Sequence, residues 1–462
     1  MIDLNLNAQK ALDDRILQRA LHNVKPRFIE KRGKAVKALE NFEEWRDYAK
    51  AIKDHTLANL EQYIREFTAR AQETGIHVHR VQDADSARRI ILNLCRKNNA
   101  RLVTKGKSMV SEEIGLNEAL SEAGIQPIET DLGEYIVQLR KERPSHLIAP
   151  AVHVPKSGVE SIFREVHVDL NPNRDLSAPE SLLAEARQKL RGHFLAADIG
   201  ITGANFLIAE TGSIVLVTNE GNGDLTHALP KIHIVITSIE KLVPRLKDAT
   251  SLLRLLARSA TGQEMSVYTS FVTGPKRSED EDGPQEMHIL LLDNGRTDLL
   301  GTDFQEMLRC IKCGACLNHC PIYHAIGGHA YGTIYAGPIG VVLSPALMGI
   351  HETVDLPEAS SFCGRCEEVC PMRIPLPRLL RQWRNRGKKF RPRKERMIFA
   401  IWAFLVKRPR LYRTVTNNLA RLFSVMGGNK KCLAWLPFSQ AWFGSRNLSV
   451  GKGSFFSQWG EE

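Results

Sequence analysis

The chain has 462 residues, of which 43% are hydrophobic and 25% are charged, with a formal net charge of +11. This length suggests about three domains, and this composition is typical of a soluble globular protein with a sizeable core. The longest uninterrupted apolar run, residues 397–406, is half of what a membrane-spanning helix needs, so we expect a buried or interfacial helix there. The amino terminus lacks the basic and apolar regions of an export signal, which favours a cytoplasmic location.

Residues 1–74 have a helical pattern, whereas helical and strand patterns alternate over residues 75–295. This order predicts a helical amino-terminal region followed by one α/β domain. In the strand pattern at 76–81, His77 and His79 face the same side, but no third ligand follows nearby, so we expect surface or core residues. Cys95 and Cys432 stand alone and are expected to be buried or incidental rather than ligands.

The turn at residues 103–109 places Lys105, Lys107 and free backbone amides at the start of a predicted helix. Such an arrangement attracts phosphate or carboxylate groups. It is not a Walker A loop, because Arg101 stands where the motif requires glycine. Anion binding and an ordinary capped helix start therefore remain as alternatives.

A second polar group lies between residues 198 and 227, around two glycine turns that do not complete a dinucleotide-binding fingerprint. Glu210 could act there as a nucleophile or base, although polar residues beside a turn are more often only turn residues. The polar residues of this segment are Asn205, Glu210, Asn219, Glu220 and Asn222.

Seven of the nine cysteines form two short arrays. The first array, C-x2-C-x2-C-x3-C-P, contains Cys310, Cys313, Cys316 and Cys320, and the shorter second array contains Cys363, Cys366 and Cys370. In two-cluster ferredoxins, three such thiolates bind one iron-sulfur cluster and the cysteine before the proline binds the other. The cysteines are too closely spaced for the usual zinc site, and a disulfide framework would need an export signal. The arrays therefore predict two iron-sulfur clusters, of the 4Fe-4S type, and electron transport.

The crossed rule assigns Cys310, Cys313, Cys316 and Cys370 to cluster 1 and Cys320, Cys363 and Cys366 to cluster 2. Ser360 stands where a full second array would have its first cysteine. A non-cysteine ligand, an iron open to exogenous donors and a three-iron cluster all remain open for cluster 2. We expect both arrays to lie in a helical ferredoxin-like domain at residues 296–385, with the glycine-rich insert 321–362 packed over the clusters.

The carboxyl-terminal extension, residues 386–462, belongs to the most basic part of the chain. From residue 376 onward, 19 lysines and arginines face three glutamates, a net charge of +16. This charge suits an acidic partner or peripheral contact with an anionic membrane, whereas nucleic acid is disfavoured because no binding motif accompanies it. A solvated helix face is the alternative. The interleaved aromatic residues are expected to contact the same partner or membrane surface, and they are Trp383, Phe390, Phe399, Trp402, Trp435 and Trp442.

Three segments, in this order, resemble the lactate utilization protein B family: TKGKSMVSEEIGLNEAL, DIGITGANFLIAETGSIVLVTNEGNGDLTH, and CIKCGACLNHCP with CGRCEEVCP. The resemblance covers nearly the whole chain. It implies an α/β lactate-utilization domain similar to sugar-phosphate isomerases and coenzyme A transferases. It also implies an electron carrier in a complex of the L-lactate dehydrogenase type, which oxidises L-lactate to pyruvate. The implied partners are a cysteine-rich subunit, a second lactate-utilization-domain protein and an electron acceptor.

Two other functions compete with this interpretation. The α/β domain could itself be a catalyst acting on a hydroxy acid or a phosphorylated substrate, held by Lys105, Lys107 and Glu210. Alternatively, the protein could be a regulator that senses redox state through its clusters and binds nucleic acid through its basic tail.

Overall fold

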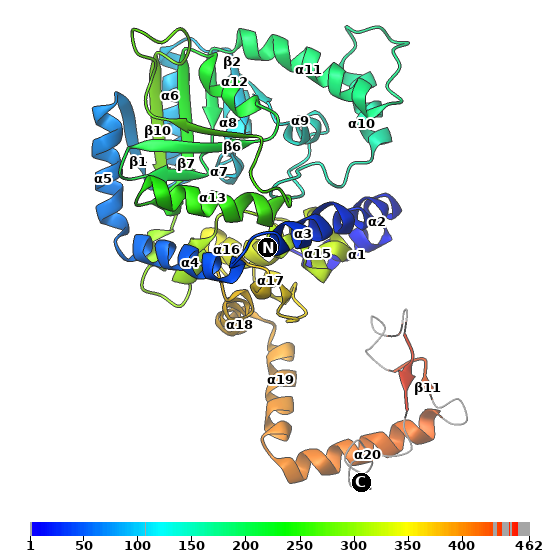
Figure 1. The fold of residues 1–462 in the computed structure, drawn as a ribbon. Helices are drawn as coiled ribbons and strands as arrows, with labels where there is room; N and C mark the ends of the chain where they lie inside the picture. The colour runs from blue at the N-terminus through cyan, green and yellow to red at the C-terminus, as the bar shows by residue number, and fades with distance from the viewer. Residues whose placement is uncertain (1, 107, 428–431, 437–442, 444–445, 451–462) are drawn as a thin grey trace. The chain divides into compact units, whose positions relative to one another are not determined.

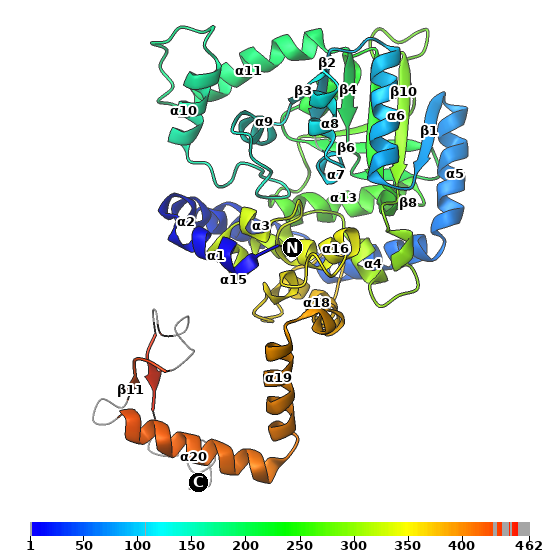
Figure 2. The same ribbon diagram turned by 180° about the vertical axis from the view of Figure 1, so that it is seen from behind.

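The computed structural model describes residues 2–106, 108–427, 432–436, 443 and 446–450. The chain divides into two compact units, Met1–Gly387 and Lys388–Glu462. The first unit contains the α/β domain, both cysteine arrays and the amino-terminal helices (Figures 1 and 2).

A six-stranded parallel sheet forms the centre of the α/β domain, with strand order β1-β10-β7-β4-β2-β3. Strands β7 and β10 lie between other strands and are almost continuously apolar and buried, as parallel strands covered on both faces must be. The predicted α/β class is therefore confirmed. The bounds are β1 (Ile76–Val81), β2 (Leu102–Gly106), β3 (Gln126–Glu129), β4 (Ile199–Thr202), β7 (Ile232–Ser238) and β10 (Glu286–Leu292).

Different layers cover the two faces of this sheet. Helices α6 (Ala84–Lys97), α7 (Met109–Glu113) and α8 (Leu116–Glu122) pack on one face, and Figure 2 shows α6 and α8 in front of the sheet. Helix α5 (Leu60–Glu73) covers the other face together with a second, four-stranded sheet. Its strand order is β8-β5-β6-β9, with bounds β5 (Phe206–Ile208), β6 (Ser213–Thr218), β8 (Leu242–Val243) and β9 (Tyr268–Val272).

The turn between β5 and β6 requires glycine. Gly212 has a φ of +68°, and a Cβ atom there would lie 2.3 Å from the backbone nitrogen of Ala71 in α5. Only glycine combines this left-handed conformation with so close an approach of two backbones. Helices α9 (Leu132–Leu139), α10 (Lys156–Val166), α11 (Pro179–Ala196), α12 (Asn222–Ala228) and α13 (Leu246–Ala260) and the turns η2 (Ile239–Lys241) and η3 (Thr297–Leu299) complete the domain.

The cysteine arrays lie in a segment built of short helices, as predicted. Trp383 is part of its core, because its ring stacks on Phe304 with centroids 4.0 Å apart and its indole N–H donates to the carbonyl of Val342 at 2.8 Å. The prediction that Trp383 belongs to a docking surface is therefore wrong. The elements are η4 (Gln305–Arg309), α14 (Ala315–Asn318), α15 (Pro321–Ile326), η5 (His329–Tyr331), α16 (Gly337–Met348), η6 (Leu356–Glu358), α17 (Arg365–Glu368) and α18 (Leu376–Gly387).

The amino-terminal helices pack against the cysteine-bearing segment as well as the α/β domain (Figure 1). Helices α1 and α2 contact α15, where Gln18 donates to the carbonyl of Ala325 at 2.8 Å, while α3 and α4 contact α13. The boundaries expected at residues 74 and 295 stay predictions, since these segments form one unit. The bounds are α1 (Leu4–Asp13), α2 (Arg15–His22), η1 (Lys25–Glu30), α3 (Lys31–Lys37), α4 (Phe42–Ala58) and α5 (Leu60–Glu73).

The second unit contains η7 (Lys388–Phe390), α19 (Arg393–Val406), α20 (Pro409–Gly427), β11 (Cys432–Leu433) and β12 (Leu448–Ser449). The apolar run expected to form a buried or interfacial helix lies in α19, and no residue of this helix is buried. Phe399 and Trp402 are about 60% exposed, as is Trp435, while Trp442 lies outside the described residues. No helix in the described part of the chain is long and apolar enough to cross a membrane.

Candidate iron-sulfur site and the adjoining cavity

The two cysteine arrays adopt the same local backbone. Lys312 and Phe362 have φ angles of +58° and +53°, and Gly314 and Gly364 follow at +73° and +80°. One-turn helices, α14 and α17, come next in both arrays. Left-handed backbone is uncommon for a side chain as bulky as phenylalanine, so its recurrence marks a specific loop conformation rather than a chance resemblance.

Ser360 occupies in the second loop the position that Cys310 occupies in the first. The backbone N–H of Lys312 donates to Cys310 Sγ at 3.3 Å, and the backbone N–H of Phe362 donates to Ser360 Oγ at 3.2 Å. The hydroxyl therefore has the same backbone partner as the thiol. Ser360 is half-buried, and Cys363, the next residue of the array, is exposed.

Four cysteines of the crossed assignment surround one cavity: Cys310, Cys313, Cys316 and Cys370. The last three are buried, and apolar residues such as Ile311 and Ile339 complete the wall. Four thiols around a small apolar cavity suit a 4Fe-4S cluster, since thiolates are its ligands. Burial raises the pKa of Cys313 to about 12, so we expect these thiols to release protons when iron binds.

The other three array cysteines are electrostatic neighbours of one another. Burial, and then the nearby Cys320 and Cys363, raise the pKa of Cys366 to about 12. Burial also raises the pKa of Cys320, which Cys363 raises further. Cys320, Cys363 and Cys366 are not part of the lining of the apolar cavity, although Cys366 also acts electrostatically on Cys316.

Two buried arginines from the amino-terminal helices bind the backbone beside the second array. Arg32 donates to the carbonyl of Val369 at 2.9 Å, and Arg46 donates to the carbonyl of Cys370. Backbone amides also point at sulfur, since Ile374 N–H lies 3.5 Å from Cys370 Sγ. Positive charge and amide donors of this kind stabilise a reduced cluster and raise its potential.

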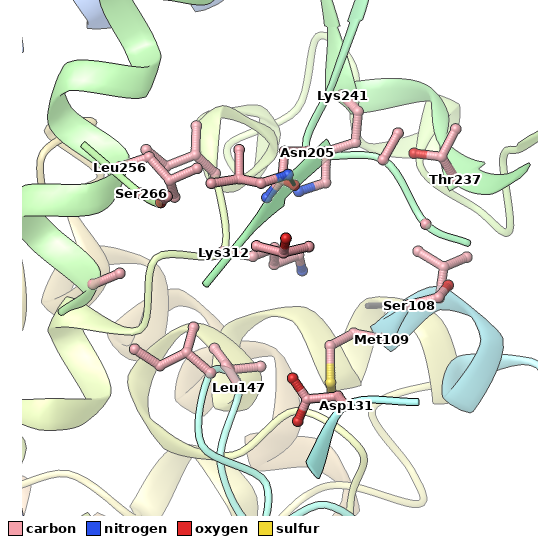
Figure 3. A pocket seen from close by; sticks show the side chains of 18 of the residues that line it. Ser108, Met109, Asp131, Leu147, Asn205, Thr237, Lys241, Leu256, Ser266 and Lys312 are labelled. Atoms are coloured by element: carbon pink, nitrogen blue, oxygen red, sulfur yellow. Dashed lines mark hydrogen bonds between the residues drawn. The ribbon is translucent and has the colours of Figure 1, made fainter. Parts of the chain in front are cut away.

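A second cavity, of about 190 Å³, lies at the carboxyl ends of β2, β3, β4 and β7 (Figure 3). The cysteine-bearing segment contributes Ile311, Lys312 and Tyr335 to its wall, and the α/β domain contributes Lys241. Ligands of open α/β sheets bind at this edge. Ile311 lines both this cavity and the cavity of the four cysteines, so a single residue spans the wall between them.

A buried ion network joins the α/β domain to the cysteine-bearing segment below this cavity. Arg296, with no exposed surface, donates to Glu113 at 2.9 and 2.8 Å and forms an ion pair with Glu240 at 2.8 Å. The hydroxyl of Tyr335 donates to Glu113 at 2.7 Å. The ammonium of Lys312 lies 4.1 Å from the centre of the Tyr335 ring. The network thereby holds Tyr335, and with it Lys312, at the cavity.

Of the two alternatives for residues 103–109, the structure favours the capped helix start, since the Ser108 side chain accepts from Ser111 N–H, and anion binding is wrong for Lys105. Its ammonium is buried and forms ion pairs with Glu112 at 2.7 Å and Glu129 at 2.6 Å. Against burial, which lowers it, Glu129 and Glu112 raise the pKa of Lys105. The charge is therefore neutralised by carboxylates within the domain. Lys107 lies outside the described residues.

The polar segment at residues 198–227 divides between different places. Glu210 is exposed and accepts a hydrogen bond from the backbone N–H of Leu246 at 2.9 Å, which supports the structural interpretation. Asn205 and Asn219 line the 190 Å³ cavity, and Asn219, Glu220 and Asn222 line a wider hollow beside α11. Glu210 and Lys105 do not line the cavity. The structure therefore does not bring together the residues that the sequence suggested for substrate binding.

The structure adds His288 to the predicted pair of strand histidines. His288 stacks on His77 and His79, with ring centroids 4.9 and 5.3 Å apart, and its Nε2 lies 2.8 Å from Glu286. In the part of the chain that the structure describes, no three His, Cys, Asp or Glu side chains are arranged to hold a single metal ion. The solitary Cys95 is buried, as expected, and Cys432 is half-buried.

Comparison with known proteins defines the class. Residues 64–292 match the LUD domain and residues 306–374 match the 4Fe-4S dicluster domain, so this is an iron-sulfur protein with two 4Fe-4S clusters and a LUD domain. The chain is 41% identical to the "Uncharacterized electron transport protein YkgF" of Escherichia coli over 99% of this chain and 96% of that protein. It is also 41% identical to "Lactate utilization protein B" of Macrococcus caseolyticus over 97% of this chain and 94% of that protein.

The chain belongs to the lactate utilization protein B family. A member from Geobacillus sp. is 46% identical over 81% of this chain and 78% of its own. A DUF162 family protein from Deinococcus radiodurans, known from its crystal structure, is 13% identical with a TM-score of 0.29, covering 50% of this chain and 98% of its own.

Proposed function

We propose that this chain is the iron-sulfur electron-transfer subunit of an assembly that oxidises L-lactate to pyruvate. The observation that carries the proposal is the pair of matching cysteine loops, one of which adjoins a cavity of the α/β domain through Ile311. The names of the relatives support the setting, because they are lactate utilization proteins and an electron transport protein. Iron-sulfur clusters pass single electrons and do not themselves take up hydride, so the chain accepts electrons and delivers them onward.

The proposed ligands follow the two groups of cysteines. Cluster 1 takes the four that surround the apolar cavity, and cluster 2 takes the remaining three, with Ser360 in the position of the fourth ligand. Crossed ligation ties the two arrays together, since the last cysteine of each serves the cluster of the other. The ligand sets are Cys310, Cys313, Cys316 and Cys370 for cluster 1, and Cys320, Cys363 and Cys366 for cluster 2.

The proposed assembly places this chain in the cytoplasm, between a donor and an acceptor of electrons. Its partners are a cysteine-rich subunit and a second protein with a LUD domain. The basic second unit provides the docking surface for an acidic acceptor or an anionic membrane, because α19 begins with arginines and then exposes apolar side chains such as Phe399 and Trp402.

The experiment that tests this function is anaerobic reconstitution of the three proteins, with L-lactate as substrate and an artificial electron acceptor. Pyruvate should form with the complete assembly, and replacing this chain by its Cys316→Ser variant should reduce the rate at least tenfold. A full rate in the absence of this chain would contradict the proposal.

A second candidate function is that the α/β domain itself handles the substrate. The cavity at the carboxyl ends of its strands favours this candidate, since Lys241 and Lys312 both line it. Lys105 and Glu210, which the sequence suggested for this role, do not.

A further inference from the structure

The 190 Å³ cavity is lined by two lysines, Lys241 and Lys312. Lys241 is 7% exposed, and among the described residues its ammonium makes no hydrogen bond or ion pair. Lys312, half-buried, has the ring of Tyr335 as the described partner of its ammonium. A buried charge without a direct partner destabilises the protein, so a ligand that brings an opposite charge is favoured there.

Other buried cations nearby have oxygen atoms of the protein as direct partners. Lys53 donates to the carbonyls of Glu240 and Leu242, and Arg296 pairs with two carboxylates. Glu240 acts electrostatically on both Lys241 and Lys312, but its direct ion pair is with Arg296. The two cavity lysines therefore differ from the other cations of this interface, and they face a space large enough for a ligand.

Neutral groups in the same cavity can bind an oxygen atom beside an anion. The hydroxyls of Thr218 and Thr237 are buried and have no hydrogen-bond partner in the described part of the chain. The side-chain oxygen of Asn205 accepts from Val217 N–H at 2.9 Å. The amide N–H groups of Asn205 are therefore the donors that a ligand can use. Figure 3 shows Asn205, Lys241 and Lys312 near one another.

Acidic groups also line the cavity, and they limit what it can hold. Asp131 and Glu134 belong to the start of α9, where Asp131 accepts from the backbone N–H groups of Gly133 and Glu134. In Figure 3, Asp131 lies away from Lys241, on the side of Met109. A polyanion would approach these carboxylates, whereas a single negative charge can remain beside the lysines. The volume is also below the roughly 300–1,000 Å³ of pockets for drug-sized ligands.

We propose that this cavity binds a small monocarboxylate bearing a hydroxyl or keto oxygen, a 2-hydroxy or 2-oxo acid, with its carboxylate at Lys241 and Lys312. Thr218, Thr237 and Asn205 bind the second oxygen. The choice of a 2-hydroxy or 2-oxo acid rests on the proposed function, whereas the choice of a small carboxylate rests on the two lysines. Because Lys312 lies between Cys310 and Cys313, the bound acid adjoins cluster 1 and not cluster 2.

The test is binding of L-lactate and of pyruvate to the anaerobic, cluster-loaded full-length protein, measured by calorimetry, with acetate and inorganic phosphate as comparison ligands. Lactate or pyruvate should bind more tightly than either comparison ligand. Lys241→Met and Thr237→Val should each weaken binding about tenfold or more, while Lys247→Met, an exposed lysine of α13, should not. Iron content and thermal unfolding of each variant confirm that it is folded and loaded.

A spectroscopic measurement tests whether the ligand binds beside cluster 1. Saturating pyruvate should change the paramagnetic resonance signal of reduced cluster 1 and leave that of cluster 2 unchanged. No binding of lactate or pyruvate at millimolar concentration, equal affinity in Lys241→Met, or preference for phosphate would overturn the inference. Lactate-dependent electron transfer in the assembly without any such binding would overturn it while leaving the proposed function intact. Binding of lactate or pyruvate without lactate-dependent electron transfer would overturn the proposed function and leave this inference intact.

Discussion

The guanidinium of Arg46, in α4, donates two hydrogen bonds to the backbone carbonyl of Cys370, at 3.0 and 2.7 Å. The same guanidinium donates to the carbonyl of Glu368 at 2.9 Å, so it covers the end of helix α17. Residues 324 positions apart are thus joined, and an amino-terminal helix determines where the last cysteine of the second array lies.

Replacing Arg46 by methionine should destabilise the cysteine-bearing segment. The carbonyls of Cys370 and Glu368 would lose charge-assisted hydrogen bonds, and Cys370 would keep only the backbone N–H of Arg373, at a cost of about 1.5–3 kcal/mol in the free energy of unfolding. Anaerobic denaturation of the cluster-loaded protein measures this change. The matched control is Arg365→Met, whose exposed ion pair with Glu368 is worth at most about 1 kcal/mol. Equal effects of the two substitutions would show that Arg46 does not support the cysteine loop.

Replacing Ser360 by cysteine should make cluster 2 more resistant to air. Ser360 Oγ accepts the same backbone hydrogen bond as Cys310 Sγ, so a thiolate there completes a four-cysteine set without a change of backbone. The rate of bleaching in air measures the effect, with Ser361→Cys on the exposed neighbouring position as the control. If cluster 2 of the unmodified protein decays no faster than cluster 1, or Ser360→Cys leaves its decay unchanged, the proposed asymmetry is wrong.

Serine substitution at the two central cysteines should separate the clusters. Cys316→Ser should remove most of the cluster 1 signal, and Cys366→Ser most of the cluster 2 signal. Because crossed ligation joins the arrays, each variant should also unfold at a lower temperature. Iron and acid-labile sulfide analysis, together with paramagnetic resonance of the reduced protein, distinguishes the two losses. Purified protein with about one zinc and no acid-labile sulfide would contradict the cluster assignment.

Removing the second unit, residues 388–462, should leave both clusters in place, because both arrays lie in the first unit. Electron transfer to the natural acceptor should nevertheless slow, since the basic surface that steers the partner is gone. Raising the ionic strength should slow the full-length protein in the same way, because salt screens such steering. A truncated protein as fast as the intact one, or transfer independent of salt, would reduce this unit to a structural extension.

Local sequence patterns predicted those parts of the structure that are formed by contacts between residues close in the sequence. The cysteine spacing predicts the cluster loops because each loop is closed by its own backbone, as the hydrogen bond from Lys312 to Cys310 shows. The strand patterns within residues 75–295 predict the α/β class for a similar reason, since each buried run, such as β7 or β10, can be recognised from its own residues.

Predictions that depend on distant residues were less successful. Lys105 looked like an anion-binding residue because Glu129, its partner, belongs to the neighbouring strand β3. Trp383 looked like part of a docking surface because its stacking partner, Phe304, comes much earlier in the chain. The cavity lysines carried a weak signal, since Lys241 follows a buried strand and Lys312 interrupts a cysteine array. Only the packing of Tyr335 against the α/β domain brings them together.

The central claim is that this chain receives electrons from lactate through its clusters. The most direct measurement is paramagnetic resonance of samples frozen at intervals after L-lactate is mixed with the oxidised, anaerobic assembly. The account predicts that the signals of reduced clusters appear in this chain at the rate of pyruvate formation and disappear when acceptor is added. Pyruvate formation while both clusters of this chain stay oxidised, with acceptor withheld, would contradict it.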